Sequence, residues 1–168
     1  MSHKLQRFQS GEVTAWTLVL VAVFCLTIAK AHIDGGALWD ASVQARREVR
    51  LMPFEEFYRR STVWYGPWVN LVGNIALFAP VGFLAYRRPL LTGLTLSVVI
   101  EATQYLTYTG YTDIDDLMFN TVGAVLGGWV ASRVGPRSRG VIVGILALGA
   151  LAVVVAFATR FALTCLGA

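Results

Sequence analysis

Acid and amide side chains stand at helical spacing inside three apolar stretches of the chain. The three pairs are Asn70/Asn74, Glu101/Gln104 and Asp116/Asn120. Residues three or four positions apart share one face of an α-helix, so each stretch presents a single polar face. In hydrocarbon such groups are costly, by about 2.5–3.5 kcal/mol for an Asp at a helix centre on insertion scales. We therefore predict that the three polar faces meet inside a helix bundle.

The composition places this bundle in a membrane. Of the 168 residues, 56% are hydrophobic and 14% are charged, against roughly 25% charged in soluble domains. A membrane-spanning helix needs about 20 mostly apolar residues. The stretches that meet or approach this length are 13–30, 68–86, 89–108, 116–132 and 140–163. We predict an all-α membrane protein forming one polytopic domain over 1–168, a bundle of about five transmembrane helices with one long extracytoplasmic loop.

The net charge of +4 does not indicate a nucleic-acid-binding protein. Arg and Lys stand at the ends of the apolar segments, and no basic stripe is interleaved with aromatic residues. Basic residues concentrate in cytoplasmic loops of membrane proteins. The tight turns around Arg87-Arg88 and around 133–139 are basic, whereas the loop 107–115 is acidic. We therefore place the amino terminus and the two basic turns in the cytoplasm, although the arginines of the long loop then lie outside.

The first third of the chain carries two local predictions. The apolar stretch that ends in Ala29-Lys30-Ala31 also fits a secretory signal with a cleavage site, but we expect a retained helix. Further on, Asp40 is positioned to cap a helix from Ala41 to about Leu51, which Pro53 would end.

The topology brings the polar faces to one depth. The second helix starts outside, the third ends outside and the fourth starts outside, so all three pairs fall in the outer layer. Asp113 and Asp115 lie just above them, and five arginines lie in the adjoining loop 32–66. The candidate ligand-binding residues are Asn70, Asn74, Glu101, Gln104, Asp113, Asp115, Asp116, Asn120, Arg46, Arg47 and Arg50.

These stretches resemble a known family. NLVGNIALFAPVGFLAY, IEATQY, TDIDDLMFNTVGAVLGG and the LMPF at 51–54 are similar to motifs of the VanZ-like membrane family, named for a protein of glycopeptide (teicoplanin) resistance, over a core of about 46–130. The matching positions are Asn74, Phe78, Pro80, Gly82, Glu101, Gln104, Asp113, Asp116, Asn120 and Gly123. Many members carry an Arg after the glycine of the outer loop, whereas Tyr111 follows Gly110 here. The resemblance implies a protein of the bacterial inner membrane and cell envelope, and a role in lowered susceptibility to lipoglycopeptide antibiotics.

The residues leave several functions open. In the first, the polar cluster binds the head of an amphiphile, a lipoglycopeptide or a lipid-linked precursor. In the second, the protein is an enzyme acting on a lipid-linked phosphate or sugar, with Glu101 and Asp116 as candidate acid–base groups. No Ser-His pair, HExxH or CxxC motif supports catalysis, so we assign no catalytic residue. In a third reading, the cluster only fixes the register of the helices.

Two further partners remain open. Asp113, Asp115 and Asp116 offer hard oxygen ligands for Mg²⁺, although no other cofactor is indicated. Small residues four apart permit close helix packing, so a partner helix in a larger membrane complex could use Gly123/Gly127 or Gly140/Gly144. Five helices are few for a transporter, and no inverted repeat is evident.

Overall fold

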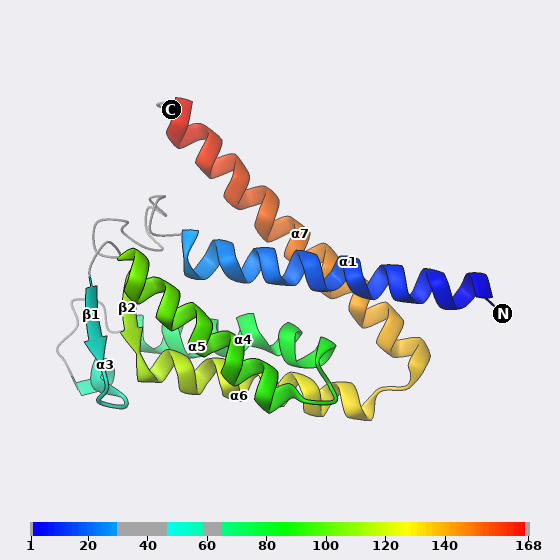
Figure 1. The fold of residues 1–168 in the computed structure, drawn as a ribbon, viewed down its shortest axis with the longest axis horizontal. Coiled ribbons are helices and arrows are strands. Elements are labelled where there is room, and N and C mark those ends of the chain that lie inside the picture. Colours follow the sequence, from blue (N-terminus) through cyan, green and yellow to red (C-terminus); the bar gives the residue numbers. More distant parts are fainter. Residues whose placement is uncertain (1, 30–46, 59–64, 167–168) are drawn as a thin grey trace.

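The computed structural model describes residues 2–29, 47–58 and 65–166. Long helices dominate, and a small sheet lies at one end (Figure 1). The elements are α1 (Ser2–Thr27), β1 (Arg47–Arg50), α3 (Glu55–Tyr58), α4 (Gly66–Leu84), α5 (Pro89–Thr107), β2 (Gly110–Asp113), α6 (Ile114–Arg133) and α7 (Pro136–Leu166). Each of the five predicted apolar stretches therefore forms a long helix.

Proline and aspartate set where these helices begin. Pro67, Pro89 and Pro136 stand at the first or second position of α4, α5 and α7, where a missing N–H leaves no hydrogen bond unmade. Asp113 caps α6 by accepting a hydrogen bond from the Asp115 N–H at 2.9 Å. At the other end of α5, Tyr108 adopts a left-handed conformation with φ 57°, which ends the helix.

The helices form two layers. α4, α5 and α6 pack side by side and form one layer. α1 and α7 contact each other and form the second layer (Figure 1). α1 rests on α4. The starts of α4 and α6 and the end of α5 all lie at the end of the bundle that carries β1 and β2 (Figure 1).

Glycines allow α4 and α6 to approach each other closely. A Cβ added at Gly82 would lie 1.7 Å from the Ala124 carbonyl oxygen, and one at Gly127 would lie 1.9 Å from that of Ala79. Such distances exclude any side chain, so backbone meets backbone along this seam. Gly123 also belongs to the seam, because its Cβ would lie 2.4 Å from the Ile75 carbonyl oxygen.

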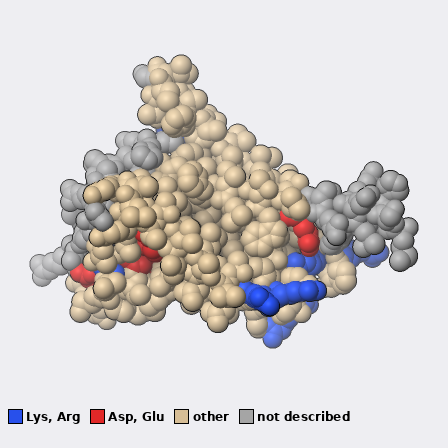
Figure 2. Space-filling view, viewed as in Figure 1, with Lys and Arg blue, Asp and Glu red and all other residues tan. Residues whose placement is uncertain are grey.

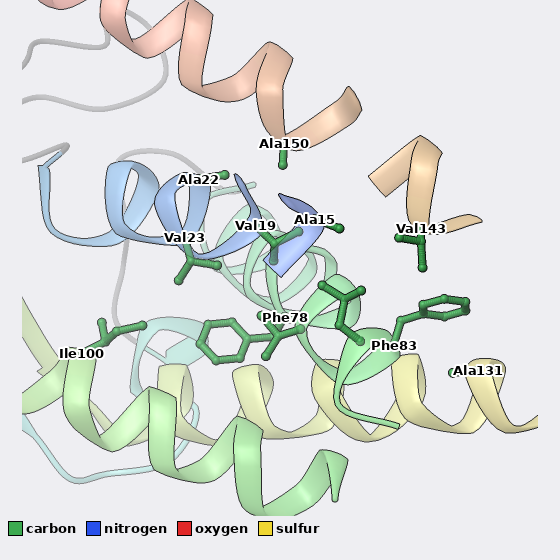
Figure 3. Close-up of a cluster of buried hydrophobic side chains, with 12 residues drawn as sticks. Ala15, Val19, Ala22, Val23, Phe78, Phe83, Ile100, Ala131, Val143 and Ala150 are labelled. Atoms are coloured by element: carbon green, nitrogen blue, oxygen red, sulfur yellow. The ribbon is translucent and has the colours of Figure 1, made fainter. Parts of the chain in front are cut away.

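The apolar core lies between the two layers (Figure 3). Phe78, fully buried on α4, belongs to one cluster with Val19 and Val23 of α1. Further along, Phe83 of α4 and Val143 of α7 join the same cluster. α1 therefore packs on α4 through this apolar cluster.

The prediction of a helix from Ala41 to about Leu51 is wrong over its described part. Arg47–Arg50 is a strand, paired in parallel with Gly110–Asp113. Residues 30–46, which include Lys30 and Ala31 of the possible cleavage site, lie outside the described residues. The loop predicted at 107–115 accordingly contains a strand. Pairing between segments so far apart in sequence leaves no local pattern, and a capping Asp with a few helix formers outweighed it.

By length and composition, two of the described helices are apolar enough to cross a membrane, Gly66–Leu84 and Pro136–Leu166. Gly11–Thr27 is a shorter apolar helix. α5 and α6 have the length but carry the buried acids and amides, which lower their hydropathy. The five-span bundle therefore remains a prediction, whereas the helical architecture is established.

Candidate functional site

The carboxylate of Asp116 joins α6 to α4. Its Oδ1 accepts hydrogen bonds from the Asn74 Nδ2 at 2.6 Å and the Asn70 Nδ2 at 3.0 Å. Asn74 also donates to the Asn70 Oδ1 at 3.1 Å. Two of the predicted polar faces therefore meet. A hydrogen bond from an amide to a carboxylate is stronger than one between two amides.

A second chain of hydrogen bonds links the acids around the start of α6. The Asp113 N–H donates to the Glu101 Oε2 at 3.0 Å, and the Asp113 carboxylate in turn caps the helix through the Asp115 N–H. Glu101, Asp113 and Asp115 are all buried, at 7%, 5% and 2% exposure. These hydrogen bonds connect α5 to β2 and to the start of α6.

Asp115 also fixes the segment before α3. Both of its carboxylate oxygens lie 2.8 Å from the Phe54 backbone nitrogen, which donates to them. Phe54 has φ 60°, an uncommon conformation for a large side chain. Its ring packs near those of Phe57 and Phe119, at 6.2 and 6.1 Å between centroids. Sequence reasoning noted the LMPF element but not that Phe54 meets an acid.

The remaining two amides of the predicted cluster point to other partners. Asn120, one turn below Asp116, donates to the Ser97 Oγ of α5 at 3.0 Å. Gln104 donates to the Thr27 backbone oxygen at the end of α1 at 3.1 Å. The oxygens of both amides, Asn120 Oδ1 and Gln104 Oε1, are buried without a hydrogen-bond partner among the described residues. The predicted residues thus form neighbouring groups that tie different elements together, rather than one shared set.

A cavity of about 380 Å³ lies between β1, α5 and the start of α6. The surface of the cavity is apolar. Two buried acids of the candidate set, Glu101 and Asp113, are among its lining residues, but their carboxylates accept hydrogen bonds from backbone N–H groups. The lining residues are Val49, Leu51, Val98, Glu101, Ala102, Tyr105, Thr112, Asp113, Ile114 and Leu117. An apolar space with a few placed polar groups is the usual form of a small-molecule site.

The VanZ/LLP1 family model matches residues 16–135. This chain belongs to the VanZ/LLP1 family. The match begins in α1 and ends before α7, so it includes every helix that bears the buried acids and amides. No curated protein and no solved structure shows a significant match.

Within this VanZ/LLP1 chain, one of the three candidate arginines can be placed. Arg46 lies outside the described residues, and of Arg47 only the backbone is described. Arg50 is half-buried and stands opposite Asp113 in the register of the sheet. Tyr111 stands where many members carry an arginine. Arg50 lies opposite Asp113, which lines the cavity, so this chain still has an arginine near it.

The acids of this VanZ/LLP1 protein are not gathered as a metal site. Across residues 2–29, 47–58 and 65–166, no three His, Cys, Asp or Glu residues are grouped so that they could share an ion. Asp115 and Asp116 turn to different partners, the Phe54 N–H and the asparagines of α4. The Mg²⁺ expectation gains no geometric support from this part of the chain.

Basic side chains gather at one end of the molecule, whereas acidic side chains appear at both ends (Figure 2). We call the end that carries β1, β2 and the first turn of α6 the acidic end, since Glu101, Asp113 and Asp115 lie there. The opposite end, the basic end, carries the turn between α4 and α5 and the turn between α6 and α7. Its arginines are Arg87, Arg88, Arg133, Arg137 and Arg139.

Proposed function

We propose that this VanZ/LLP1 protein is a multi-pass protein of the bacterial inner membrane whose cavity at the acidic end binds an amphiphile from the outer leaflet. The observation that carries the proposal is an open apolar cavity whose lining residues include Glu101 and Asp113, with their carboxylates buried behind its apolar wall. An amphiphile has the complementary form, an apolar chain next to hydroxyl, amide or amine donors.

The orientation of the bundle supports the outer leaflet. The basic end gathers five arginines in short turns, and basic residues of short loops favour the cytoplasm. The acidic end and its cavity then face outward. α4 and α7, the two described helices apolar enough to span, support the insertion of the bundle in a membrane.

The walls of the cavity open toward lipid. Val49, Leu51 and Val98 line it and are 48%, 72% and 49% exposed. An acyl chain or the lipid tail of a lipoglycopeptide would cover these side chains while its polar head reaches Glu101. Family membership makes a lipoglycopeptide or a lipid-linked wall precursor the class of ligand to test first, and binding of this kind would lower susceptibility by withholding drug or target.

Binding of fluorescent teicoplanin to the protein in lipid nanodiscs tests this function. Glu101→Gln keeps an acceptor for the Asp113 N–H but removes the charge, and Ala102→Phe fills the cavity with an aromatic ring. We expect each to weaken binding by roughly tenfold or more, the loss of one charge-assisted hydrogen bond or of the apolar site. Ala152→Phe, on the exposed face of α7, is the matched control and should bind like the unaltered protein.

The outcome against the proposal is equally defined. Unchanged affinity in both cavity variants would place any binding elsewhere. A parallel series with a lipid-linked wall precursor in place of teicoplanin distinguishes the two ligand classes. Expression in a susceptible bacterium, with Glu101→Gln as comparison, then tests whether binding and lowered susceptibility go together.

A second role is favoured by the exposed surface of α7. Gly144 has no atom within 4 Å of a Cβ built on it, and Val141 and Ile145 are 60% and 61% exposed. Gly123 and Gly127 are already covered by α4, which leaves the Gly140/Gly144 face for a partner helix. If α7 packs against such a partner, Gly144→Leu should release it in mild detergent, as seen by light scattering, and a monomer with nothing attached before mutation would exclude the role.

A further inference from the structure

A second apolar hollow lies between α1 and α5, away from the cavity of the acidic end. It measures about 420 Å³ and is lined by Trp16, Leu20, Leu91, Thr92, Thr95, Leu96 and Val99. Its walls are open, because Leu20, Leu91 and Val99 are 40%, 56% and 54% exposed. We call it the α1–α5 groove.

The groove begins at the basic end. Leu91 follows Arg88 by three residues, a rise of about 4.5 Å along a helix. On the facing helix, Trp16 lies one turn after Glu12, whose carboxylate pairs with Arg139 at 3.5 Å. Both walls of the groove therefore start at the level of the arginines.

The arginines at the mouth are not equivalent. Arg139 is held within the protein, since it pairs with Glu12 and its guanidinium lies 5.4 Å and 4.1 Å from the ring centroids of Phe83 and Tyr86. Arg87 and Arg88 are exposed in the turn before α5. The Tyr86 hydroxyl accepts a hydrogen bond from the Arg87 Nε at 3.2 Å and raises the pKa of this guanidinium.

We propose that the α1–α5 groove and the Arg87-Arg88 turn bind one anionic phospholipid of the cytoplasmic leaflet. An acyl chain lies along Leu20, Leu91 and Val99, and the phosphate lies against Arg87 and Arg88. Charge complementarity selects this occupant, since an apolar groove that starts three residues after the exposed Arg88 matches an anionic lipid better than a neutral one. Trp16 suits the interfacial depth at which the headgroup meets the chain.

The site rests on the membrane insertion and orientation contained in the proposed function, and not on the outer cavity. Trp16 provides a reporter for it, because bromine atoms on a lipid chain quench a neighbouring indole. The measurement is the quenching of the Trp16 component, taken as the difference between the unaltered protein and Trp16→Phe. The vesicles are phosphatidylcholine with a small fraction of either brominated phosphatidylglycerol or brominated phosphatidylcholine.

We expect brominated phosphatidylglycerol to reach the same quenching of Trp16 at a mole fraction roughly fivefold lower than brominated phosphatidylcholine needs. A preference of this size corresponds to one or two contacts between the phosphate and an arginine. The double variant Arg87→Gln/Arg88→Gln should abolish this preference. Arg160→Gln, an exposed arginine near the far end of α7, should keep it. Thr95→Phe, which fills the groove, should reduce Trp16 quenching by both lipids.

Each other result overturns the site. Equal quenching by both lipids, or a preference that survives in the double variant, removes the arginines from lipid selection. A preference that persists in Trp16→Phe belongs to the other tryptophans and to general surface charge. Absence of quenching by either lipid contradicts membrane insertion itself, which separates failure of this site from failure of the function proposed above.

Discussion

The α4–α5–α6 unit and the α1–α7 pair are both built from apolar helices, yet they are held together by different means. Between α4 and α6, glycines bring backbones into contact and the partly buried carboxylate of Asp116 accepts hydrogen bonds from amides across the interface. Between α1 and α7, small side chains such as Ala15 and Ala150 pack in the core cluster, and most of α7 is exposed. The first arrangement tolerates no added atom and loses much when a polar group is removed, whereas the second has room.

Adding one methyl group to each region should show the largest difference. In Gly127→Ala the new Cβ would lie 1.9 Å from the Ala79 carbonyl oxygen, whereas in Gly149→Ala it would meet nothing within 4 Å. We expect Gly127→Ala to lower the free energy of unfolding by about 3 kcal/mol or more through overpacking. Gly149→Ala should be neutral or stabilising by up to about 1 kcal/mol, because Ala is the better helix former.

Denaturant titration of the two variants in the same micelles measures this difference. If Gly127→Ala unfolds like the unaltered protein, the seam between α4 and α6 is not the close backbone contact described above.

Removal of a polar partner should give the next largest effect. Asp116→Ala leaves the Asn70 and Asn74 amides without the carboxylate they donate to, at a cost of about 2 kcal/mol. Thr159→Val in α7 removes only a hydroxyl that bonds to the Val155 backbone oxygen of its own helix, and should change stability by less than about 0.5 kcal/mol. Thermal unfolding followed by circular dichroism compares the two, and equal effects would show that the Asp116 group adds nothing specific to the core.

A smaller and local effect is expected at the edge of the core. Asp115→Ala removes both oxygens that accept the Phe54 N–H, a loss of about 1–2 kcal/mol confined to the neighbouring segment. Hydrogen exchange should speed up for the Phe54 amide and for Arg47–Arg50, while amides in the middle of α4 and α6 keep their protection. Faster exchange throughout the bundle would mean that this acid supports the whole core.

The contrast between the two regions also explains what the sequence allowed to be predicted. The length of the apolar stretches predicted the five helices, because this signal is local and is summed over many residues. Spacing identified Asn70, Asn74 and Asp116 as residues of facing helices, and these three do bond to one another. The family motifs added the same helices and the correct family.

Other parts depended on contacts that no local pattern reports. The pairing of Arg47–Arg50 with Gly110–Asp113 was missed because its segments lie far apart in the chain. Glu101 and Gln104 share a helix face, yet one bonds to the Asp113 N–H and the other to the Thr27 carbonyl oxygen. A shared face fixes direction only to within a turn, and it does not say which neighbouring element a side chain will meet. The α1–α5 groove could not be predicted from the sequence either, because its lining residues come from two helices and carry no motif.

The smallest effect is expected for the ion pair inside the α1–α7 pair. Glu12 of α1 pairs with Arg139 of α7 at 3.5 Å, and the side chains are 38% and 13% exposed. A partly exposed ion pair contributes at most about 1 kcal/mol, so Glu12→Gln should lower stability by no more than that. Arg139→Met should cost somewhat more, about 1–2 kcal/mol, because it also removes the guanidinium from the rings of Phe83 and Tyr86. Unfolding of both single variants and the double variant separates the ion pair from the ring contacts. If Glu12→Gln alone destabilised the protein as much as Gly127→Ala, a single surface charge would hold α1 and α7 together, and the division into a tightly packed core and a loosely attached pair would be wrong.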